Sequence, residues 1–480
     1  MIPHETSADA MLAALEAQRE DHLAVGPASL ALRRDRLQRC IDLLRTHEDT
    51  LVDAICRDFG HRSEAQSRFT DIAASITALD HAQKHVGRWM RSQRRKVGPF
   101  PLNLLGAKAR IDYQPLGVVG VISPWNFPVS LTFTPLAGVL AAGNRALIKP
   151  SEYTPATSEA LASAVAQHFD PKELHVVTGG PQTGADFSAL PFDHLIFTGA
   201  TSVARHVMRA AAEHLVPVTL ELGGKSPVIV GRTAAMQAAA ERIVLGKMLN
   251  AGQICLAPDY ALVPRPRIDE FIEAIRAAVC AMYPTLLEND DYASMVNKRH
   301  FDRIRGYLDE ARAQDAQVIE LNPASEDFSK QPNHKLPLTL IVDPDDKLAA
   351  MQDEIFGPVL PVKPYESIKE AIDFVNARPR PLGLYYFGDD DKERSAVLAQ
   401  TISGGVTIND VVMHAAQEDL PFGGIGPSGM GCYHGIDGFR TFSHAKSVFT
   451  QSKVNVADLA GLQPPYGEKL RRTVRQQIGK

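Results

Sequence analysis

The sequence predicts an α/β protein built on doubly wound, mostly parallel sheets, and two alternations of segments support this. From Arg145 to Val230, short apolar runs alternate with amphipathic stretches of helical spacing, and a second alternation extends from Thr233 to about Asn409. Parallel strands are joined by crossover helices, so each alternation indicates a sheet with helices on its faces. Ligands of such sheets bind at the carboxyl ends of the strands, so residues at strand ends are candidates for function.

The individual elements follow from the same patterns. In the first alternation, strands are expected at 145–150, 173–179, 194–199, 217–224 and 226–231, and helices at 157–169 and 202–215. In the second, helices are expected at 269–283, 299–314 and 367–378, between strand-like runs at 260–266, 337–343, 384–388 and 405–410. The chain therefore contains two α/β units in succession.

The flanking segments differ from these units. From Ser7 to about Arg95 the apolar residues recur at helical spacing, which predicts a helical layer. From Val97 to Pro124, apolar runs are interrupted by glycine and proline, which indicates strands or a hairpin. The segment 421–449 is rich in glycine and then in β-favouring residues, and a tail follows it.

Composition excludes several classes of protein. With 480 residues, 45% of them hydrophobic, and a mean hydropathy of −0.13, the chain is expected to be globular and soluble. The formal net charge is −5, and the basic runs at 91–96 and 469–480 lack interleaved aromatic residues, so no nucleic-acid partner is expected. No apolar run approaches the length of a membrane span.

The cysteines indicate a reducing compartment. There are five, an odd number without zinc-ligand spacing, so neither a disulfide framework nor a metal site is expected. The N-terminus lacks the basic start and apolar core of a signal peptide. The expected location is the cytoplasm.

Cys255 and Glu221 are the first candidates for catalysis. Cys255 lies in the run GQICLAPDY, between a glycine-containing turn and a proline. A lone cysteine is more often a core residue than a nucleophile. Glu221 ends an apolar strand before Gly223 and Gly224, where a raised pKa would suit a general base; an ordinary strand-end glutamate is the alternative.

Polar residues elsewhere could bind an oxyanion or a nucleotide. Asn126, in ISPWNFPVS, could donate its amide to an oxyanion, although it could equally be a turn residue. Lys149 and Glu152 follow a strand and are either a surface ion pair or a clamp for ribose hydroxyls.

Three further patterns concern nucleotide binding. Thr198 and Gly199 connect an apolar strand directly to a helix, whose first turn can offer backbone N–H groups to a pyrophosphate. The GxGxxG pattern at 424–429 has no preceding strand and contains Pro427, so it is better interpreted as a glycine-rich loop. Glu354 and Phe356 lie at a turn entering a strand, where the ring could pack against a cofactor.

Together these runs resemble the NAD(P)-dependent aldehyde dehydrogenase superfamily. The match runs from about Asp112 to Val448 through SPWNFP, IKPSE, FTGA, LELGGK, GQIC, EIFGPV and PFGG, in the family's order. ERIVLGKMLNAGQICLAPDY resembles the class 3 branch, and FGGIGPSGMGCYHG with the tail at 464–466 resembles bacterial coniferyl aldehyde dehydrogenases. The resemblance implies a doubly wound cofactor domain, an α/β catalytic domain and a small β oligomerisation element.

The resemblance also implies roles for single residues. Cys255 takes the position of the nucleophile, Glu221 that of the general base and Asn126 that of the oxyanion donor. The implied cofactor contacts are Ile122, Pro124, Trp125, Lys149, Glu152, Thr198, Gly199, Ala200, Val203, Leu222, Glu354 and Phe356. Ala200 and Ala204 depart from the family's usual Ser and Gly, which removes a hydroxyl contact and leaves backbone donors.

The implied activity is oxidation of an aldehyde to a carboxylic acid through a thiohemiacetal and a thioester on Cys255. The expected substrate is coniferyl aldehyde or another aromatic or hydrophobic aldehyde. NAD is the expected cofactor, because the Glu152 carboxylate would oppose a 2'-phosphate, and NADP is the alternative. The chain could instead be a general aliphatic aldehyde dehydrogenase, a CoA-acylating dehydrogenase or a non-catalytic nucleotide-binding homologue; Glu221 and Cys255 argue against the last two.

The resemblance finally implies domain boundaries and an assembly. Residues 1–97, 114–220 and 410–431 would form the NAD-binding domain, 221–409 the catalytic domain, 98–113 and 432–450 the oligomerisation element, and 451–480 a tail. The expected partners are a small aldehyde and a second copy of the chain in a homodimer, with a tetramer left open. No membrane partner is expected.

Overall fold

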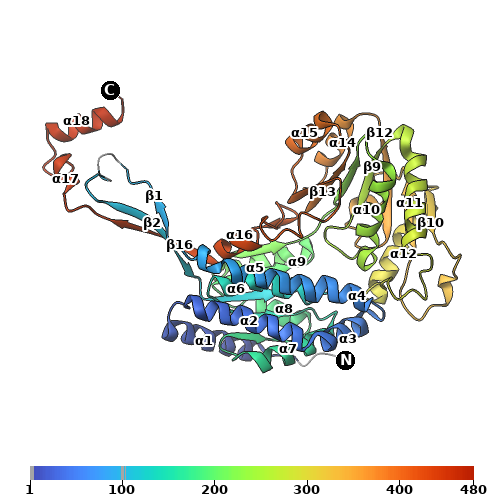
Figure 1. Cartoon of the computed structure of the whole chain (residues 1–480), viewed down its shortest axis with the longest axis horizontal. Helices are drawn as coiled ribbons and strands as arrows, with labels where there is room; N and C mark the ends of the chain where they lie inside the picture. Colours follow the sequence, from blue (N-terminus) through green and yellow to red (C-terminus); the bar gives the residue numbers. More distant parts are fainter. Residues whose placement is uncertain (1–4, 99–101, 103, 480) are drawn as a thin grey trace.

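The computed structural model describes residues 5–98, 102 and 104–479, and its strands form three sheets (Figure 1). The first sheet has the order β15-β7-β6-β3-β4-β5, in which only β15 is antiparallel. Its strands are β3 (Val118–Ile122), β4 (Arg145–Lys149), β5 (Leu174–Val176), β6 (His194–Thr198), β7 (Val218–Glu221) and β15 (Gly429–Met430). The helices between them are α6 (Ser130–Ala141), α7 (Pro155–His168), α8 (Pro181–Ser188) and α9 (Thr201–Ala212).

The second sheet has the order β10-β11-β12-β9-β8-β13-β14, and only β10 is antiparallel to its neighbour. Its strands are β8 (Pro227–Val230), β9 (Tyr260–Pro264), β10 (Gln317–Leu321), β11 (Leu338–Val342), β12 (Val359–Tyr365), β13 (Gly383–Phe387) and β14 (Gly405–Ile408). The run at 226–231, expected to belong to the first alternation, is β8 of this sheet. The α/β fold class is confirmed.

Helices and short turns connect the strands of the second sheet. The helices are α10 (Met236–Met248), α11 (Ile268–Met282), α12 (Lys298–Ala313), α13 (Ala349–Gln352), α14 (Ile368–Asn376) and α15 (Asp391–Gln400). The 3-10 turns are η2 (Leu249–Gly252), η3 (Arg265–Arg267) and η4 (Phe328–Lys330). The side chain of Asn297 caps α12, and that of Asp390 caps α15, each by accepting backbone N–H groups.

The N-terminal segment forms the expected helical layer. It contains α1 (Ala8–Val25), α2 (Leu30–Thr46), α3 (Glu48–Phe59), α4 (Glu64–Ser67), the π-helical turn η1 (Arg68–Ala73) and α5 (Ala74–Trp89). Ser7 and Ser29 accept backbone N–H groups at the starts of α1 and α2, which fixes where these helices begin. The layer ends earlier than expected, because Gln93–Arg95 is a strand that pairs with a later segment.

The third sheet, of β1 (Gln93–Arg95), β2 (Lys108–Pro115) and β16 (Ser443–Thr450), forms an arm that projects from the body (Figure 1). Helix α16 (Gly435–Thr441) precedes β16, and α17 (Val456–Leu459) and α18 (Glu468–Gln477) follow it near the far end of the arm. The expected domain boundaries stay predictions; residues 1–4, 99–101, 103 and 480 lie outside the described part of the chain.

Helix α6 shows how the first sheet is connected to the N-terminal layer. Almost all of its residues are buried, and they belong to one hydrophobic core with residues of α2, α3 and α5 and the sheet. The segment that enters α6 carries Asn126. Burial of α6 therefore places that segment against both layers.

Candidate active site

The carboxyl ends of four neighbouring strands bring predicted residues together. In the strand register, Ile122 of β3 pairs with Lys149 of β4 and with Phe197 of β6, and Thr198 of β6 pairs with Glu221 of β7. Since all four strands are parallel, these residues lie at one edge of the sheet. This is the edge at which doubly wound sheets bind their ligands.

The loop before Cys255 has a backbone that few residues adopt. Asn250, Ala251 and Gly252 have φ values of 50°, 51° and 75°, in the left-handed region. A Cβ atom at Gly252 would lie 2.5 Å from the carbonyl oxygen of Gly357, so glycine is required there. Such strain persists only where surrounding contacts enforce it, and it clusters at functional sites.

Buried amides hold this loop in place. Asn250 Nδ2 donates to the carbonyl oxygens of Asn126 at 3.0 Å and of Gln253 at 3.3 Å. Gln253 Nε2 donates to Asn250 O at 2.9 Å and to Ser294 O at 3.0 Å, and its Oε1 accepts the N–H of Val296. Both amides are fully buried. The position of Cys255 is therefore fixed before any ligand binds.

The thiol of Cys255 is partly buried and lies near two carboxyl groups. Burial raises its pKa to about 12, and the carboxyl groups of Glu354 and Glu221 contribute in the same direction. The backbone N–H groups of Cys255 and Leu256 act in the opposite direction, so donors face the sulfur. The thiol is consequently protonated at neutral pH, and nucleophilic attack requires transfer of its proton.

Glu221 is a fully buried carboxyl group at the end of β7. Neither of its carboxyl oxygens has a hydrogen-bond partner among the described residues. Burial holds its pKa well above the usual range for glutamate. A carboxyl group in this state is a strong proton acceptor once it ionises, which is the property required of a general base near neutral pH.

Glu354 packs against the glycine turn that follows Glu221. A Cβ atom at Gly223 would lie 2.0 Å from Glu354 Oε1, so this contact exists only because residue 223 is glycine. Burial, followed by the charge of Asp259, raises the pKa of Glu354 to about 8, while the backbone N–H of Gly224 opposes the shift. Glu354 also lies near Cys255, because its charge raises the pKa of that thiol.

Phe356 and Trp125 lie beside each other at this site. Their ring centroids are 5.3 Å apart in an edge-to-face arrangement, and Phe356 has a φ of 49°. Asn126, next to Trp125, is buried and donates from Nδ2 to the carbonyl oxygen of Gln253 at 3.1 Å. The Asn126 amide therefore borders the loop that carries Cys255.

The residues predicted to bind a nucleotide range from buried to exposed. The ammonium of Lys149, whose pKa burial lowers, lies 3.2 Å from Glu152 Oε2, and Glu152 is partly exposed. Helix α9 starts after Thr198 and Gly199; Ala200 is its N-cap and makes no side-chain capping bond. Within the first turn, the N–H of Val203 donates to Ala200 O at 3.0 Å, whereas the N–H groups of Thr201 and Ser202 precede the first hydrogen bond of the helix and can donate to a ligand. Pro124 and Ile122 are partly exposed, Val203 is 48% exposed, and Leu222 is buried.

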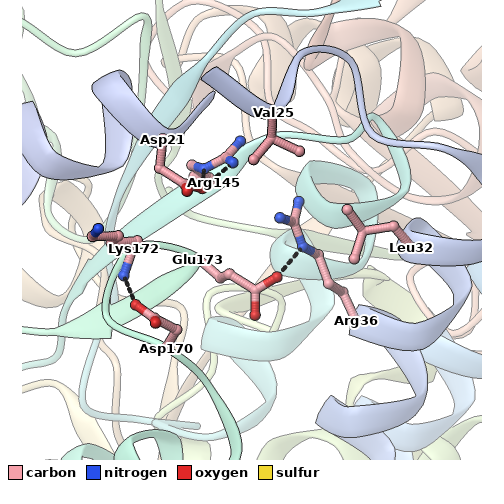
Figure 2. Close-up of a pocket in the computed structure, with 8 residues that line it drawn as sticks. All are labelled: Asp21, Val25, Leu32, Arg36, Arg145, Asp170, Lys172 and Glu173. Carbon is pink, nitrogen blue, oxygen red and sulfur yellow. Dashed lines mark hydrogen bonds and ion pairs between the residues drawn. The ribbon is translucent and has the colours of Figure 1, made fainter. Parts of the chain in front are cut away.

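A cavity of about 240 Å³ lies at the opposite edge of the first sheet (Figure 2). It is lined by Asp21, Val25, Leu32, Arg36, Arg145, Asp170, Lys172 and Glu173. Arg145 begins β4, whereas Lys149 ends it, so the cavity is at the amino end of the strand. Its arginines are engaged, because Arg36 pairs with Glu173 and Arg145 with Asp21. The cavity therefore lies at the other end of the strands from Lys149 and Glu221.

One aromatic residue near Glu221 and Cys255 was not predicted. Tyr433 is buried, and its pKa is raised first by burial and then by the charges of Glu221 and Cys255. The bridge between Phe422 and Tyr433 holds it there. Its only signal in the sequence was its place in the run GCYHG.

Two absences hold for the described part of the chain. No group of three or more His, Cys, Asp or Glu side chains there is placed to hold a metal ion. No helix there is long and apolar enough to cross a membrane.

A doubly wound sheet whose strand ends meet a fixed cysteine and a buried carboxyl group defines a class of α/β enzyme with a covalent nucleophile. A sequence model of the aldehyde dehydrogenase family matches residues 1–448, and the chain belongs to this family. It is therefore an oxidoreductase that acts on aldehydes.

Particular relatives are similar along almost the whole chain. A probable coniferyl aldehyde dehydrogenase of Caulobacter vibrioides is 58% identical over 97% of this chain and 96% of its own. A coniferyl aldehyde dehydrogenase of a Pseudomonas species is 52% identical over 96% of this chain and 95% of its own.

Solved structures agree with the fold. The substrate-bound AldH of Staphylococcus aureus superposes with a TM-score of 0.89 at 35% identity, covering 98% of this chain and 99% of its own. The Mycobacterium tuberculosis aldehyde dehydrogenase, complexed with NAD+, superposes with a TM-score of 0.84 at 27% identity, covering 94% and 92%.

Proposed function

We propose that the chain oxidises an aldehyde to a carboxylic acid with Cys255 as nucleophile, Glu221 as general base and Asn126 as oxyanion donor. The observation that carries this proposal is the loop at 250–256. Its left-handed residues and buried amides hold the loop against the Asn126 amide, and Cys255 lies within the electrostatic influence of Glu221. Pre-organised donors and a nearby acceptor are what covalent catalysis at a thiol needs.

In the first step, the Cys255 thiolate attacks the carbonyl carbon of the aldehyde, after its proton has been transferred to a base. The resulting thiohemiacetal oxygen carries negative charge, which the Asn126 amide and the backbone N–H of Cys255 stabilise. In the last step, Glu221 takes a proton from water, and the hydroxide attacks the thioester on Cys255. The acid is released and the thiol is regenerated.

NAD is the proposed cofactor. When bound, it would accept the hydride whose loss converts the thiohemiacetal to the thioester. The residues present fit it. Lys149 and Glu152 would bind ribose hydroxyls, the first turn of α9 would offer backbone N–H groups to the pyrophosphate, and Glu354, whose charge acts on the Cys255 thiol, would contact the nicotinamide end with Phe356. The carboxylate of Glu152 would repel a 2'-phosphate, which favours NAD over NADP.

Coniferyl aldehyde is the proposed substrate. Two relatives that cover almost the whole chain carry that substrate in their names. Phe127, Phe422 and Tyr433 belong to the hydrophobic core that Cys255 packs against, which suits an aromatic aldehyde. An aliphatic aldehyde is the alternative.

We also propose a homodimer joined through the arm, in the cytoplasm. The edge strand β16 is largely exposed and carries Phe449, which is 53% exposed. An exposed edge strand has unpaired backbone groups that a second copy of the chain can pair. All five cysteines are free thiols, which suits a reducing compartment. Light scattering of the purified chain and of a form truncated in β16 tests the dimer.

The activity is tested by NAD reduction with coniferyl aldehyde, benzaldehyde, a medium-chain aliphatic aldehyde and succinic semialdehyde, with Cys255→Ala beside the parent. Coniferyl aldehyde is expected to give the highest kcat/KM, and the variant no signal. A higher kcat/KM with the aliphatic aldehyde would show that the proposed substrate is wrong and would leave the proposed mechanism intact. Full activity of Cys255→Ala would show that Cys255 is not the nucleophile.

A further inference from the structure

Two buried charges of the N-terminal layer contact the segment that carries Asn126. Nη2 of Arg62 lies 2.6 Å from Oδ2 of Asp71, and neither side chain is exposed. Arg62 follows α3, and Asp71 lies on the π-helical turn η1. Turns of this kind are rare in helices and frequently occur at functional sites. The mechanism proposed above gives neither residue a role.

Each member of the pair bonds the backbone of the segment 126–130. Arg62 Nη1 donates to the carbonyl oxygen of Asn126 at 2.7 Å. Asp71 Oδ1 accepts the N–H groups of Val129 at 3.1 Å and of Ser130 at 3.3 Å. The pair therefore holds this segment at both ends.

The contacts of Arg62 require a planar guanidinium. Its central carbon lies 4.9 Å from the ring centroid of Phe59 and 5.0 Å from that of Phe127, and Nη2 also donates to Thr70 Oγ1 at 3.1 Å. A lysine ammonium cannot make these flat contacts and directed bonds together. A buried ion pair is weak evidence for stability alone, because desolvation offsets its attraction. The flat contacts and directed hydrogen bonds of Arg62 indicate that the Arg62–Asp71 pair positions the backbone of residues 126–130.

The carbonyl oxygen of Asn126 also accepts Asn250 Nδ2 at 3.0 Å. One atom thus joins Arg62, the Asn126 segment and the loop that carries Cys255. We propose that Arg62 and Asp71 are positioning residues, which hold the Asn126 amide where it stabilises the oxyanion formed on Cys255. This inference rests on the oxyanion role proposed for Asn126.

The test is a double-mutant cycle of Arg62→Lys and Asn126→Ala. The readout is the single-turnover rate constant of NADH formation with enzyme in excess, which does not depend on the fraction of active enzyme. Asn126→Ala is expected to lower it by about 10²–10³-fold, and Arg62→Lys by about 10–100-fold through displacement of the amide. The double variant is expected to be no slower than Asn126→Ala, within about threefold. Losses that multiply would overturn the inference.

Arg36→Lys is the matched control, because Arg36 lies in α2 of the same helical layer, is 2% exposed, and has its Nε 2.9 Å from Oε1 of Glu173. It is expected to keep the parent's single-turnover rate constant within about threefold. A fall as large as that of Arg62→Lys would mean that loosening the layer is sufficient, and the inference would fail.

If Arg62→Lys does not fold, Asp71→Asn carries the same cycle, since an amide oxygen still accepts from Val129 and Ser130 while the charge that faces Arg62 is lost. Failure of the two proposals can be told apart. An Asn126→Ala variant as fast as the parent removes the oxyanion role and the inference with it. If Asn126→Ala is slow but the losses of the two single variants multiply in the double variant, the oxyanion role stands and only the inference about Arg62 and Asp71 fails.

Discussion

The loop that carries Cys255 and the turn that starts α9 are built in opposite ways. The loop has left-handed residues held by the fully buried amides of Asn250 and Gln253. The turn has an uncapped helix start at Ala200 and an exposed Val203. The loop is fixed by the protein's own hydrogen bonds, whereas the start of α9 leaves backbone N–H groups for a ligand to complete.

The largest expected effect concerns Glu221, the buried carboxyl group that acts on Cys255 of the loop. Glu221→Gln preserves the shape of the side chain but removes the proton acceptor, so hydrolysis of the thioester should slow by about 10²–10⁴-fold. The first turnover should persist, because attack by Cys255 and hydride loss precede that step. Stopped-flow NADH absorbance is expected to show a burst followed by a slow phase; equal loss of both phases would contradict the role.

The same raised pKa predicts how the parent responds to pH. Because burial raises the pKa of Glu221, this carboxyl group gains its basic form at a higher pH than an ordinary glutamate does. Hydrolysis of the thioester should therefore become faster as pH rises, and Glu221→Gln should lose that dependence.

Gly252→Ala tests whether the strained loop is required. The added Cβ would lie 2.5 Å from Gly357 O, at a φ of 75° that alanine disfavours, so Cys255 should move. A shift of about 1 Å is expected to lower kcat about 100-fold. Gly306→Ala in α12 is the control, because a Cβ there meets nothing within 4 Å. If both variants match the parent, the loop tolerates displacement and the comparison fails.

Glu354 provides a test in stability rather than rate. Its pKa is raised from 4.5 to about 8 by burial, so the folded state favours its protonated form. The stability it contributes is fully present below pH 4.5 and is lost as pH rises toward about 8. Glu354→Gln lacks this loss, so its Tm relative to the parent should rise between these values. A constant difference in Tm across this range would contradict the burial of the charge.

The sequence indicates these residues as candidates because each lies in a short run with its own local pattern. Cys255, Glu221 and Lys149 follow or precede glycine and proline at the ends of apolar segments, where functional residues of parallel sheets are found. The two alternations predicted both sheets for the same reason.

Other features depend on contacts between distant parts of the chain. Helix α6 is apolar on all sides, so it lacks the periodicity that identifies a surface helix. Arg62 and Asn126 bond across 64 residues, and Glu354 fits against Gly223 only after two sheets have packed. No local pattern indicates Arg62 or Asp71, because both side chains bond backbone atoms of a segment that is distant in the sequence.

The smallest expected effect concerns Ala200, at the start of α9. Ala200→Ser places a hydroxyl at the N-cap of α9, where the present residue makes no side-chain bond. A serine there should stabilise the helix start by about 0.5–2 kcal/mol and raise Tm slightly. It should also tighten NAD binding severalfold if the hydroxyl contacts the pyrophosphate, since one such hydrogen bond contributes about 1 kcal/mol. Isothermal titration measures the Kd, and Ala212→Ser at the other end of α9 is the control. An unchanged Kd with a raised Tm would mean that the cap is filled by the helix itself, and the turn would then bind through backbone N–H groups alone.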